Sequence, residues 1–394
     1  MVSLSTADNA LKEVYLGVLS NQLNTQINPL LARINQTTSD VWGKEIRKVA
    51  PFGINGGIGA GTETGDLPVS AENNYEQFVL SLKNLYGKLE ISDKAIRASE
   101  NSTGAFVNLL TNEMDGLIKA SMFNFGRMLY GDGTGFLAEI AENDTNSVKV
   151  DTTKNLIEGM VVDVVSSAGS KIQTNLRIAG INKQTGVVTF NTSSLTDGAY
   201  DGQGYKLCVQ GSYNNEITGL GAIFKETGEL YGLSKSKYNW LVPYTKDISN
   251  SGATSNITDI TIQTAIDNME EDADSKVDFI VCSSGVKRNY QSYLASYRSN
   301  INVMELEGGY KAISYNGIPM VSDRFAPNNT MYLLNTSEFN LHQLCDWKWL
   351  EGEDGRVIKQ TPGKPTFQAT LVKYADIICN KPKGQARITG ISES

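Results

Sequence analysis

Histidine is nearly absent from this sequence, which has one, His342, among its 394 residues. A zinc site needs three or four ligands, usually Cys or His, at short spacings, and no such cluster occurs. Cys345 and Asp346 follow His342, but no arrangement of oxyanion donors accompanies them, so we expect a structural histidine rather than a Cys–His site. The sequence therefore predicts no catalytic residue, no metal site and no enzymatic activity.

Cysteines are few and lie far apart in the chain. Cys208, Cys282, Cys345 and Cys379 form no C-x-x-C pair, which is typical of reduced, mostly buried thiols. No apolar run approaches the roughly 18 residues of a membrane span. The first residues also lack the basic and apolar regions of a secretory signal. We therefore expect a globular protein with no membrane partner.

Basic residues do not predominate either. Lys and Arg number 35 against 43 Asp and Glu, a net charge of −8. Affinity for nucleic acid depends on clustered Lys and Arg, so an electrostatic nucleic-acid binder is disfavoured. A container that encloses nucleic acid without gripping it is compatible with this balance.

Motifs that bind phosphates are also lacking. Residues 57–61 read Gly-Ile-Gly-Ala-Gly, but no third glycine and no immediate helix follow, as a dinucleotide fingerprint requires. No G-x-x-x-x-G-K-[ST] occurs. We therefore expect no cofactor, and we interpret the glycines as part of a flexible arm.

This arm is the most unusual stretch that the sequence does contain. Residues 52–66 include six glycines, which give the backbone freedom and leave little side chain to bury. A strand-like alternation then returns over 75–92. Such an arm makes sense if a second molecule supplies its packing surface. The predicted inter-subunit contacts are Phe52, Ile54, Gly56, Gly57, Ile58, Gly59, Gly61 and Asp66.

A long helix is predicted over 101–131. Asn101-Ser102-Thr103 are helix-capping residue types, and Gly131-Asp132-Gly133 is a stop signal. At 1.5 Å per residue the helix would be roughly 40 Å long. Internal glycines cost about 1 kcal/mol each, so we expect packing on both sides. Its apolar stripe consists of Phe106, Leu110, Met114, Leu117, Ser121, Phe125 and Met128.

The other segments differ in their predicted secondary structure. Residues 6–23 are predicted as a helix and 24–50 as an extended arm. Short β-rich runs separated by turns over 147–213 predict a small inserted barrel or sandwich. A compact α/β unit is predicted from a helix over 261–274, a strand over 277–282, a helix from 284, and strands over 318–322 and 331–335. A long strand is expected over 366–378.

This order of parts resembles the major capsid protein of tailed bacteriophages, with the Hong Kong 97-like fold. No single motif is specific, and the resemblance rests on the order and spacing of segments over nearly the whole chain. Besides the arm, the loop and the long helix, the segments are Thr218–Ile223, Val281–Arg288, Tyr315–Asp323, Met331–Asn335 and Tyr374–Asn380.

The resemblance implies an α+β fold with a defined division of the chain. It assigns 1–50 to an N-terminal arm and 51–92 to an extended loop that overlies a neighbouring subunit. The peripheral domain with its spine helix would comprise 93–146 and 351–394. An inserted all-β domain would occupy 147–213, and the axial domain 214–350.

The implied function is structural. A protein of this family self-assembles into hexamers and pentamers of an icosahedral shell that encloses double-stranded DNA without sequence-specific binding. Its expected partners are copies of itself, portal and scaffold proteins and a decoration protein. Its location would be the virion, after assembly in the host bacterial cytoplasm.

Two departures from the family pattern matter. Some members join subunits covalently through a lysine in the extended loop, but no lysine occurs here between Lys48 and Lys83, so we do not expect that bond. Many members also carry a long N-terminal scaffolding segment. Here the first predicted helix begins at residue 6, so we expect either a separate scaffold protein or a sequence that starts after processing.

Two other functions fit parts of the sequence. An encapsulin-type bacterial nanocompartment would share the fold and contain cargo enzymes. A β-rich, glycan-binding surface protein would use the exposed Tyr and Trp residues of the insert and would remain small in solution.

Overall fold

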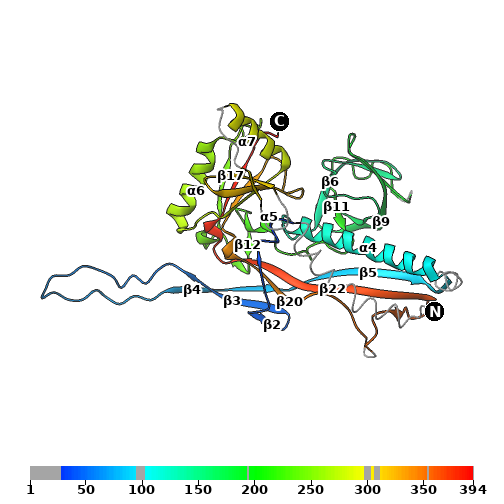
Figure 1. Ribbon diagram of the computed structural model, residues 1–394, viewed down its shortest axis with the longest axis horizontal. Coiled ribbons are helices and arrows are strands. Elements are labelled where there is room, and N and C mark those ends of the chain that lie inside the picture. The colour runs from blue at the N-terminus through cyan, green and yellow to red at the C-terminus, as the bar shows by residue number, and fades with distance from the viewer. Residues whose placement is uncertain are drawn as a thin grey trace.

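The computed structural model describes residues 28–94, 103–192, 195–296, 303–305, 311–352 and 355–393. Figure 1 shows a body of two sheets, a barrel beside it, and a long hairpin that projects from one end. The mixture of strands and helices confirms the α+β class. The helix predicted over 6–23 lies outside the described residues. Within the described part of the chain, no helix is long and apolar enough to cross a membrane.

A five-stranded sheet forms one side of the body. Its strands run in the order β1-β20-β22-β21, and β5 also pairs with β22, from Lys83↔Ala375 to Ser92↔Thr366. The long strand β22 confirms the strand predicted over 366–378. The bounds are β1 (Asn35–Thr37), β5 (Lys83–Ser92), β20 (Phe339–Trp349), β21 (Lys359–Gln360) and β22 (Thr366–Cys379).

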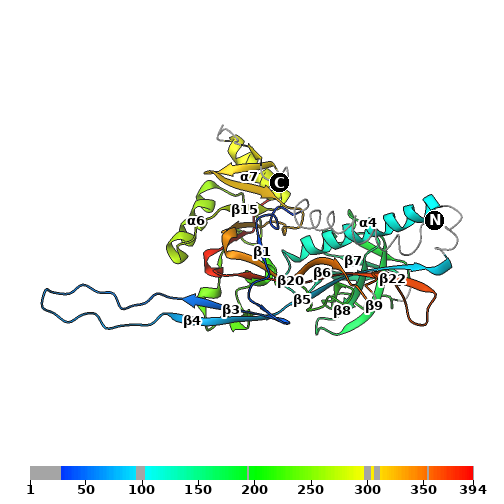
Figure 2. The ribbon, with the colours of Figure 1, turned by 60° about the horizontal axis from the view of Figure 1, so that its bottom comes forward.

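The helix α4 (Thr103–Met128) runs along this sheet in both Figure 1 and Figure 2. It confirms the long helix predicted over 101–131. A turn follows at once, because the Gly131 N–H donates to the Met128 carbonyl at 3.0 Å. The hydrophobic core between sheet and helix includes Leu85 and Leu89 of β5. Burial of an apolar face therefore stabilises a helix that its glycines weaken.

A seven-stranded sheet forms the second part of the body. Its order is β14-β23-β19-β15-β18-β17-β16. The helices α6 (Asp259–Ala273) and α7 (Ser284–Ser296) share one apolar cluster with one face of this sheet, and the other face joins the core beside α4. The strands are β14 (Tyr244–Asp247), β15 (Phe279–Cys282), β16 (Val303–Glu305), β17 (Lys311–Tyr315), β18 (Ile318–Ser322), β19 (Met331–Leu334) and β23 (Ala386–Thr389).

Two strands pair across the expected domain boundary at residue 350. β20 falls within the expected axial segment 214–350, yet it pairs with β22. β23 falls within the expected peripheral segment 351–394, yet it pairs with β14 and β19. The local pattern predicted β-structure in the long strand over 366–378 but not the partners, because strand pairing depends on long-range context.

The inserted region is a closed barrel of order β10-β7-β6-β11-β8-β9. It begins earlier than the expected boundary at residue 147, because β6 pairs with both β7 and β11. Alternate side chains of these strands fill its interior. The strands are β6 (Phe136–Asn143), β7 (Ser147–Val150), β8 (Val161–Val165), β9 (Lys171–Asn182), β10 (Val187–Phe190) and β11 (Lys206–Val209).

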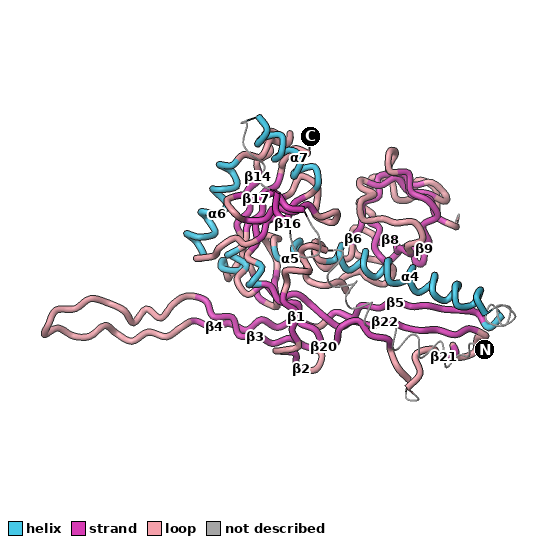
Figure 3. Tube along the Cα trace, in the orientation of Figure 1, coloured by secondary structure: helices cyan, strands magenta, loops and turns pink. Residues whose placement is uncertain are grey.

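The projecting hairpin has an outgoing strand that the sequence did not predict. β3 (Glu45–Phe52) pairs with β4 (Asn74–Ser81) in register from Glu45↔Ser81 to Phe52↔Asn74, and β2 (Val41–Trp42) completes the sheet. Figure 3 shows the connecting loop 53–73 extending far beyond the ends of both strands. Residues 45–50, the end of the expected extended arm over 24–50, thus belong to β3.

The arm is also not free of its own body. Leu30, Leu31 and Ile34 are buried in the main core, and the Asn28 side chain accepts the N–H groups of Leu30 and Leu31. The remaining short elements are α5 (Leu220–Ile223), β12 (Glu229–Leu230), β13 (Leu233–Ser234), and single 3₁₀ turns at Asn239–Leu241, Thr336–Glu338 and Pro382–Gly384.

Candidate subunit interface

The loop 53–73 presents apolar side chains to solvent. Ile54 and Ile58 are each 79% exposed, Val69 is 87% exposed and Leu67 is 90% exposed. The outgoing and returning halves run side by side: a Cβ on Gly59 would lie 3.2 Å from Pro68, and one on Gly57 would lie 3.2 Å from the Ala71 nitrogen. The loop thus keeps its backbone together without a core of its own.

The predicted contact residues differ in exposure: those within the loop are mostly exposed, whereas Phe52 packs on its own chain. Gly56, Gly59 and Gly61 are exposed, as is Asp66, and Gly57 is half-buried against the returning half of the loop. Phe52 instead packs within its own chain, stacked on Trp240 with ring centroids 5.3 Å apart. The predicted contact of Phe52 with another subunit stays a prediction.

An aromatic clamp, formed by Phe52, Phe78, Tyr231, Tyr238 and Trp240, holds the root of the hairpin. The ring of Phe78 lies 4.9 Å from that of Tyr231 and 5.7 Å from that of Trp240, and the Tyr238 hydroxyl donates to Glu76. The Tyr231 carbonyl accepts the Val79 N–H at 3.0 Å, and the Tyr231 hydroxyl accepts the Cys379 N–H at 2.9 Å. The clamp fixes the direction in which the hairpin leaves the body.

The opposite face of the hairpin is open. Trp42 is 72% exposed, and Val49 and Tyr75 are each 59% exposed. Sequence reasoning missed these residues, because it assigned 24–50 to an arm without strand periodicity. The alternation of Val49 with the buried Ile46 and Ala50 was the available signal.

The spine helix is buried over a wider face than its predicted stripe. Met114, Phe125 and Met128 are buried as expected, and Leu117 is partly buried against the same core. Phe106 and Leu110 lie among helix residues whose side chains are outside the described part. The additional buried residues are Ile118, Met122 and Phe123. This wider face agrees with the predicted packing on both sides.

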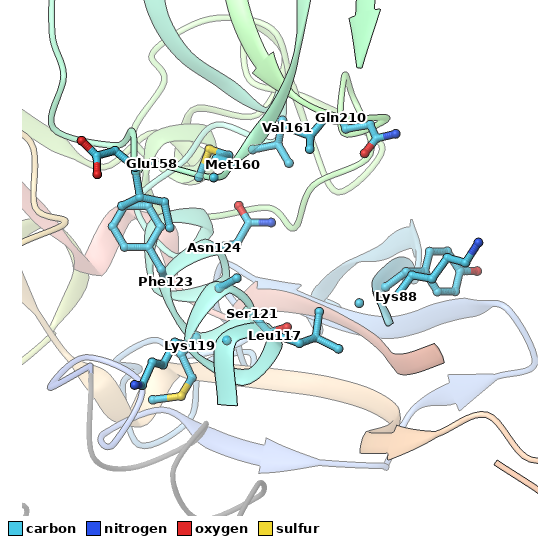
Figure 4. Close-up of a pocket in the computed structure, with 18 of the residues that line it drawn as sticks. Lys88, Leu117, Lys119, Ser121, Phe123, Asn124, Glu158, Met160, Val161 and Gln210 are labelled. Carbon is cyan, nitrogen blue, oxygen red and sulfur yellow. The ribbon is translucent and has the colours of Figure 1, made fainter. Parts of the chain in front are cut away.

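A groove of about 820 Å³ lies between α4, β5 and the barrel. Figure 4 shows Met160 and Val161 of the barrel on one side of α4 and Lys88 of β5 on the other. Gly116 leaves open space in the groove, since a Cβ at this position would meet nothing within 4 Å. Its charged lining residues are Lys88, Lys119, Arg177, Arg324, Glu113 and Glu158.

Buried polar contacts hold the barrel and the helix in place. Arg127 of α4 forms an ion pair with Glu216, both side chains at most 3% exposed, and one of its bonds measures 2.9 Å. Lys154 of the barrel donates to Asn328 at 2.7 Å and to the Ala326 carbonyl. The Arg127–Glu216 pair joins α4 to the segment that follows the barrel. Lys154 joins the barrel to the segment between β18 and β19.

Asp376 forms a second buried polar centre. Its carboxylate accepts the Thr218 N–H at 2.6 Å, the Thr218 hydroxyl at 3.1 Å and its neighbour's N–H at 2.8 Å. Burial raises the pKa of Asp376 to about 6, against the opposing effect of these bonds. The same side chain thus ties β22 to the segment that follows the barrel.

Lys373 and His342 are buried on the five-stranded sheet. Lys373 donates to Gln343 at 2.8 Å and to Asp346 at 2.6 Å, and burial lowers its pKa. His342 shares a 2.9 Å hydrogen bond between Nδ1 and the Ser39 carbonyl, and burial lowers its pKa too. Both positions are consistent with structural roles. Within the described ranges, no group of three or more His, Cys, Asp or Glu residues could hold a metal ion.

Comparison with known proteins rests on the fold alone. No protein-family model and no curated protein sequence matches this chain. The chain is similar to one in the Cyanophage A-1(L) capsid asymmetric unit, with 13% identity and a TM-score of 0.54 over 94% of this chain and 91% of that chain.

Two further structures are more distantly similar. One is a chain of the satellite phage P4 procapsid with its size determination protein, with 9% identity and a TM-score of 0.45 over 97% and 98% of the two chains. The other is the holo-SrpI encapsulin complex of Synechococcus elongatus PCC 7942, with 10% identity and a TM-score of 0.44 over 93% and 89%. The cyanophage match shows that this chain has the fold of a phage capsid chain, which confirms the predicted resemblance at the level of the fold.

Proposed function

We propose that this chain is the major capsid protein of a tailed bacteriophage, which self-assembles into hexamers and pentamers of an icosahedral shell around double-stranded DNA. The observation that carries the proposal is the loop 53–73, which exposes four aliphatic side chains that nothing in the described part of the chain covers. The fold shared with a phage capsid chain supports the same role. The role is structural and includes no catalytic step.

Burial of the loop on a neighbouring copy supplies free energy for assembly. Fully burying an aliphatic side chain such as Ile54 or Leu67 stabilises by about 1.5–3 kcal/mol. Ordering the backbone opposes this by roughly 1–2 kcal/mol per residue. A large interface is therefore needed, and obligate interfaces commonly bury about 2,000–5,000 Å². A shell of identical copies provides such interfaces for every loop.

The geometry of the hairpin suggests where it moves when a shell matures. The clamp holds the strands up to Phe52, whereas Gly53 has a φ of +78°, a conformation that glycine adopts most easily. The loop therefore pivots at Gly53 relative to a fixed root. The glycines beyond it let the loop follow a neighbour as the shell changes from precursor to mature form.

The charge balance fits enclosure of DNA rather than recognition of its sequence. A net charge of −8 gives the chain no excess of phosphate-binding groups. Portal, scaffold and decoration proteins would be its other partners, and the virion its location. The domain division expected from the sequence belongs to the same proposal, with β6 moved to the insert, β20 to the peripheral sheet and β23 to the axial sheet.

Electron microscopy of the purified protein, expressed alone and with a scaffold protein, tests the proposal. We expect closed particles that protect DNA when they are isolated from infected cells. Particles that contain a cargo enzyme and no DNA would favour a nanocompartment instead. A protein that elutes as a monomer in gel filtration, binds glycans and never forms particles would contradict a shell function.

A loop variant tests the role of the glycines. Replacing Gly56, Gly57, Gly59 and Gly61 by alanine should leave the subunit folded, since none of the four has a positive φ. Assembly or expansion should be impaired, because the loop loses backbone freedom. The same substitution at Gly202, which is exposed in the barrel but has a positive φ of 62°, shows the effect of local strain alone. Unchanged shells from the loop variant would remove this role.

A further inference from the structure

Two Asn-Gly pairs occur in this chain, Asn55-Gly56 in the loop 53–73 and Asn316-Gly317 between β17 and β18. In such a pair the backbone nitrogen of glycine can attack the side-chain carbonyl carbon of asparagine, because glycine has no Cβ to obstruct the approach. All four residues are exposed to solvent. We infer that Asn55 modifies itself in this way in the unassembled subunit, whereas Asn316 is protected.

The reaction needs no partner other than water. A bond forms between the Gly56 nitrogen and Asn55 Cγ, and the Cγ–Nδ2 bond breaks. The electron pair of that bond and the proton of the Gly56 N–H leave with the amide nitrogen as ammonia. Water then opens the resulting cyclic succinimide at either carbonyl carbon. The product at position 55 is aspartate, or isoaspartate with the main chain routed through Cβ and Cγ.

The loop holds the Asn55 side chain in a conformation that favours this attack. Its Oδ1 atom accepts the Gly57 N–H at 2.9 Å, so the side-chain carbonyl folds back over the backbone that follows it. Negative charge develops on this oxygen when the Gly56 nitrogen adds to Cγ, and a hydrogen-bond donor already in place stabilises that charge. Both residues of the pair lie outside the strand pairing of the hairpin, which ends at Phe52↔Asn74.

The second pair is restrained by its hairpin. Asn316 and Gly317 form a two-residue turn, with Tyr315 paired to Ile318 at the strand ends. Their φ values are +48° and +84°, as expected of the hairpin turn that favours Asn-Gly. The attacking nitrogen of Gly317 also donates its hydrogen to Ser314 Oγ at 3.1 Å. Attack on the Asn316 side chain therefore requires the turn to open first.

The modification changes both the charge and the length of the loop. The loop already carries Glu63, Asp66 and Glu72 and has no Lys, Arg or His, and the product adds a further negative charge. Each added charge raises the cost of burying the loop, and isoaspartate also lengthens the main chain. This consequence rests on the proposed function: a subunit that waits long in solution becomes less able to assemble. Asn55 thus records the time that a subunit spends outside a shell.

Peptide mapping of the full-length subunit, kept too dilute to assemble, tests the inference. The protein is incubated at mildly alkaline pH, with and without denaturant, and trypsin then releases the two pairs in peptides 49–83 and 312–324. Mass spectrometry and enzymatic methylation of isoaspartate quantify the product. In the folded subunit Asn55 should react at least about tenfold faster than Asn316, which corresponds to about 1.4 kcal/mol for opening the turn. In denaturant the two rates should converge.

Gly56→Ala is the matched variant. Gly56 has no positive φ, and a Cβ there would lie 3.7 Å from the Ala71 Cβ, an ordinary contact, so the loop keeps its conformation. The added methyl group obstructs the backbone nitrogen, so modification of Asn55 should be lost over the same incubation. The inference is overturned if Asn55 stays intact in the folded wild type, reacts no faster than Asn316, or reacts equally fast in Gly56→Ala.

A second measurement separates this inference from the proposed function. Aged subunits, of which a measured part is modified at Asn55, are assembled, and peptide 49–83 is compared between the particles and the soluble remainder. The modified form should be depleted from the particles, and equal proportions overturn the consequence for assembly. Failure of fresh subunits to form particles, with or without scaffold, overturns the shell function and leaves the modification of Asn55 standing.

Discussion

The loop 53–73 and the helix α4 are made of similar residues in opposite surroundings. Both contain glycines among aliphatic side chains, yet Leu67 is 90% exposed and Met114 is 1% exposed. The helix is covered by a sheet and by side chains from the second part of the body, whereas no other described segment of the same chain covers the aliphatic side chains of the loop. Burial is therefore decided by what the fold places over a segment and not by the segment's composition.

The glycines show the same contrast at the level of single atoms. A Cβ on Gly126 of α4 would lie 2.6 Å from the ring of Phe325, which is itself buried. A Cβ on Gly116, ten residues earlier in the same helix, would meet nothing within 4 Å. One glycine is thus required by close packing, and the other leaves room at the groove.

The largest expected effect comes from breaking the buried ion pair that supports α4. Arg127→Ala leaves Glu216 buried without its partner, so the free energy of unfolding should fall by about 3–5 kcal/mol. Denaturant unfolding of the unassembled subunit measures this. The control is Arg127→Met with Glu216→Leu, which removes both charges and should cost much less. Equal losses for both variants would show that the side chains matter through packing alone.

A smaller effect compares the two helix glycines directly. Gly126→Ala gains helix propensity of up to about 1 kcal/mol but forces the Phe325 ring to move, at a cost of about 1–3 kcal/mol. The net result should be destabilisation. Gly116→Ala, the matched control, should stabilise by up to about 1 kcal/mol. Thermal unfolding of both variants checks the signs, and stabilisation by both would disprove the close contact.

The smallest effect is a pH dependence. The pKa of Asp376 rises from its ordinary 3.8 to about 6 on folding, so between these values the folded state binds more protons than the unfolded state. Stability from this group is therefore greatest at low pH and is lost as the pH rises through 6, by about 1 kcal/mol between pH 5 and 7.

Comparison with Asp376→Asn isolates this dependence. The Asp376→Asn variant should lack this pH dependence. The free energy of unfolding of the variant, relative to that of the wild type, should therefore increase from pH 5 to pH 7, as measured by denaturant unfolding. Asp66→Asn on the exposed loop is the matched control. A wild type and Asp376→Asn that keep a constant difference over this range would refute the assignment.

Segments with a strong local pattern were predictable. The helix α4, the strand β22 and the helices α6 and α7 follow from periodicity and capping residues, and the glycine loop follows from composition. The structure also places Met114, Phe125 and Met128 in the core, as their spacing indicated. In these cases the residues of a single helix, strand or loop are enough to predict its conformation.

Features that depend on partners distant in sequence were not predictable. The clamp joins Phe52 to Trp240, and the groove is lined by Lys88 of β5 and by Arg177 of the barrel. β3 was missed because its alternation is weak. The pairing of β20 with β22, and of β23 with β14 and β19, was not predicted, because local β-propensity carries no information about pairing. The glycine loop was therefore visible in the sequence, while the groove beside α4 was not.

The pairing of β23 has a consequence for synthesis of the chain. β14 lies beside β23 and β19 lies on its other side, with Tyr244 opposite Ala386. At 5–20 residues per second, a ribosome reaches β23 roughly 7–28 s after it has made β14. Until then β14 lacks its neighbour and β19 has an open edge. A subunit thus has an unfinished sheet until β23 has been made.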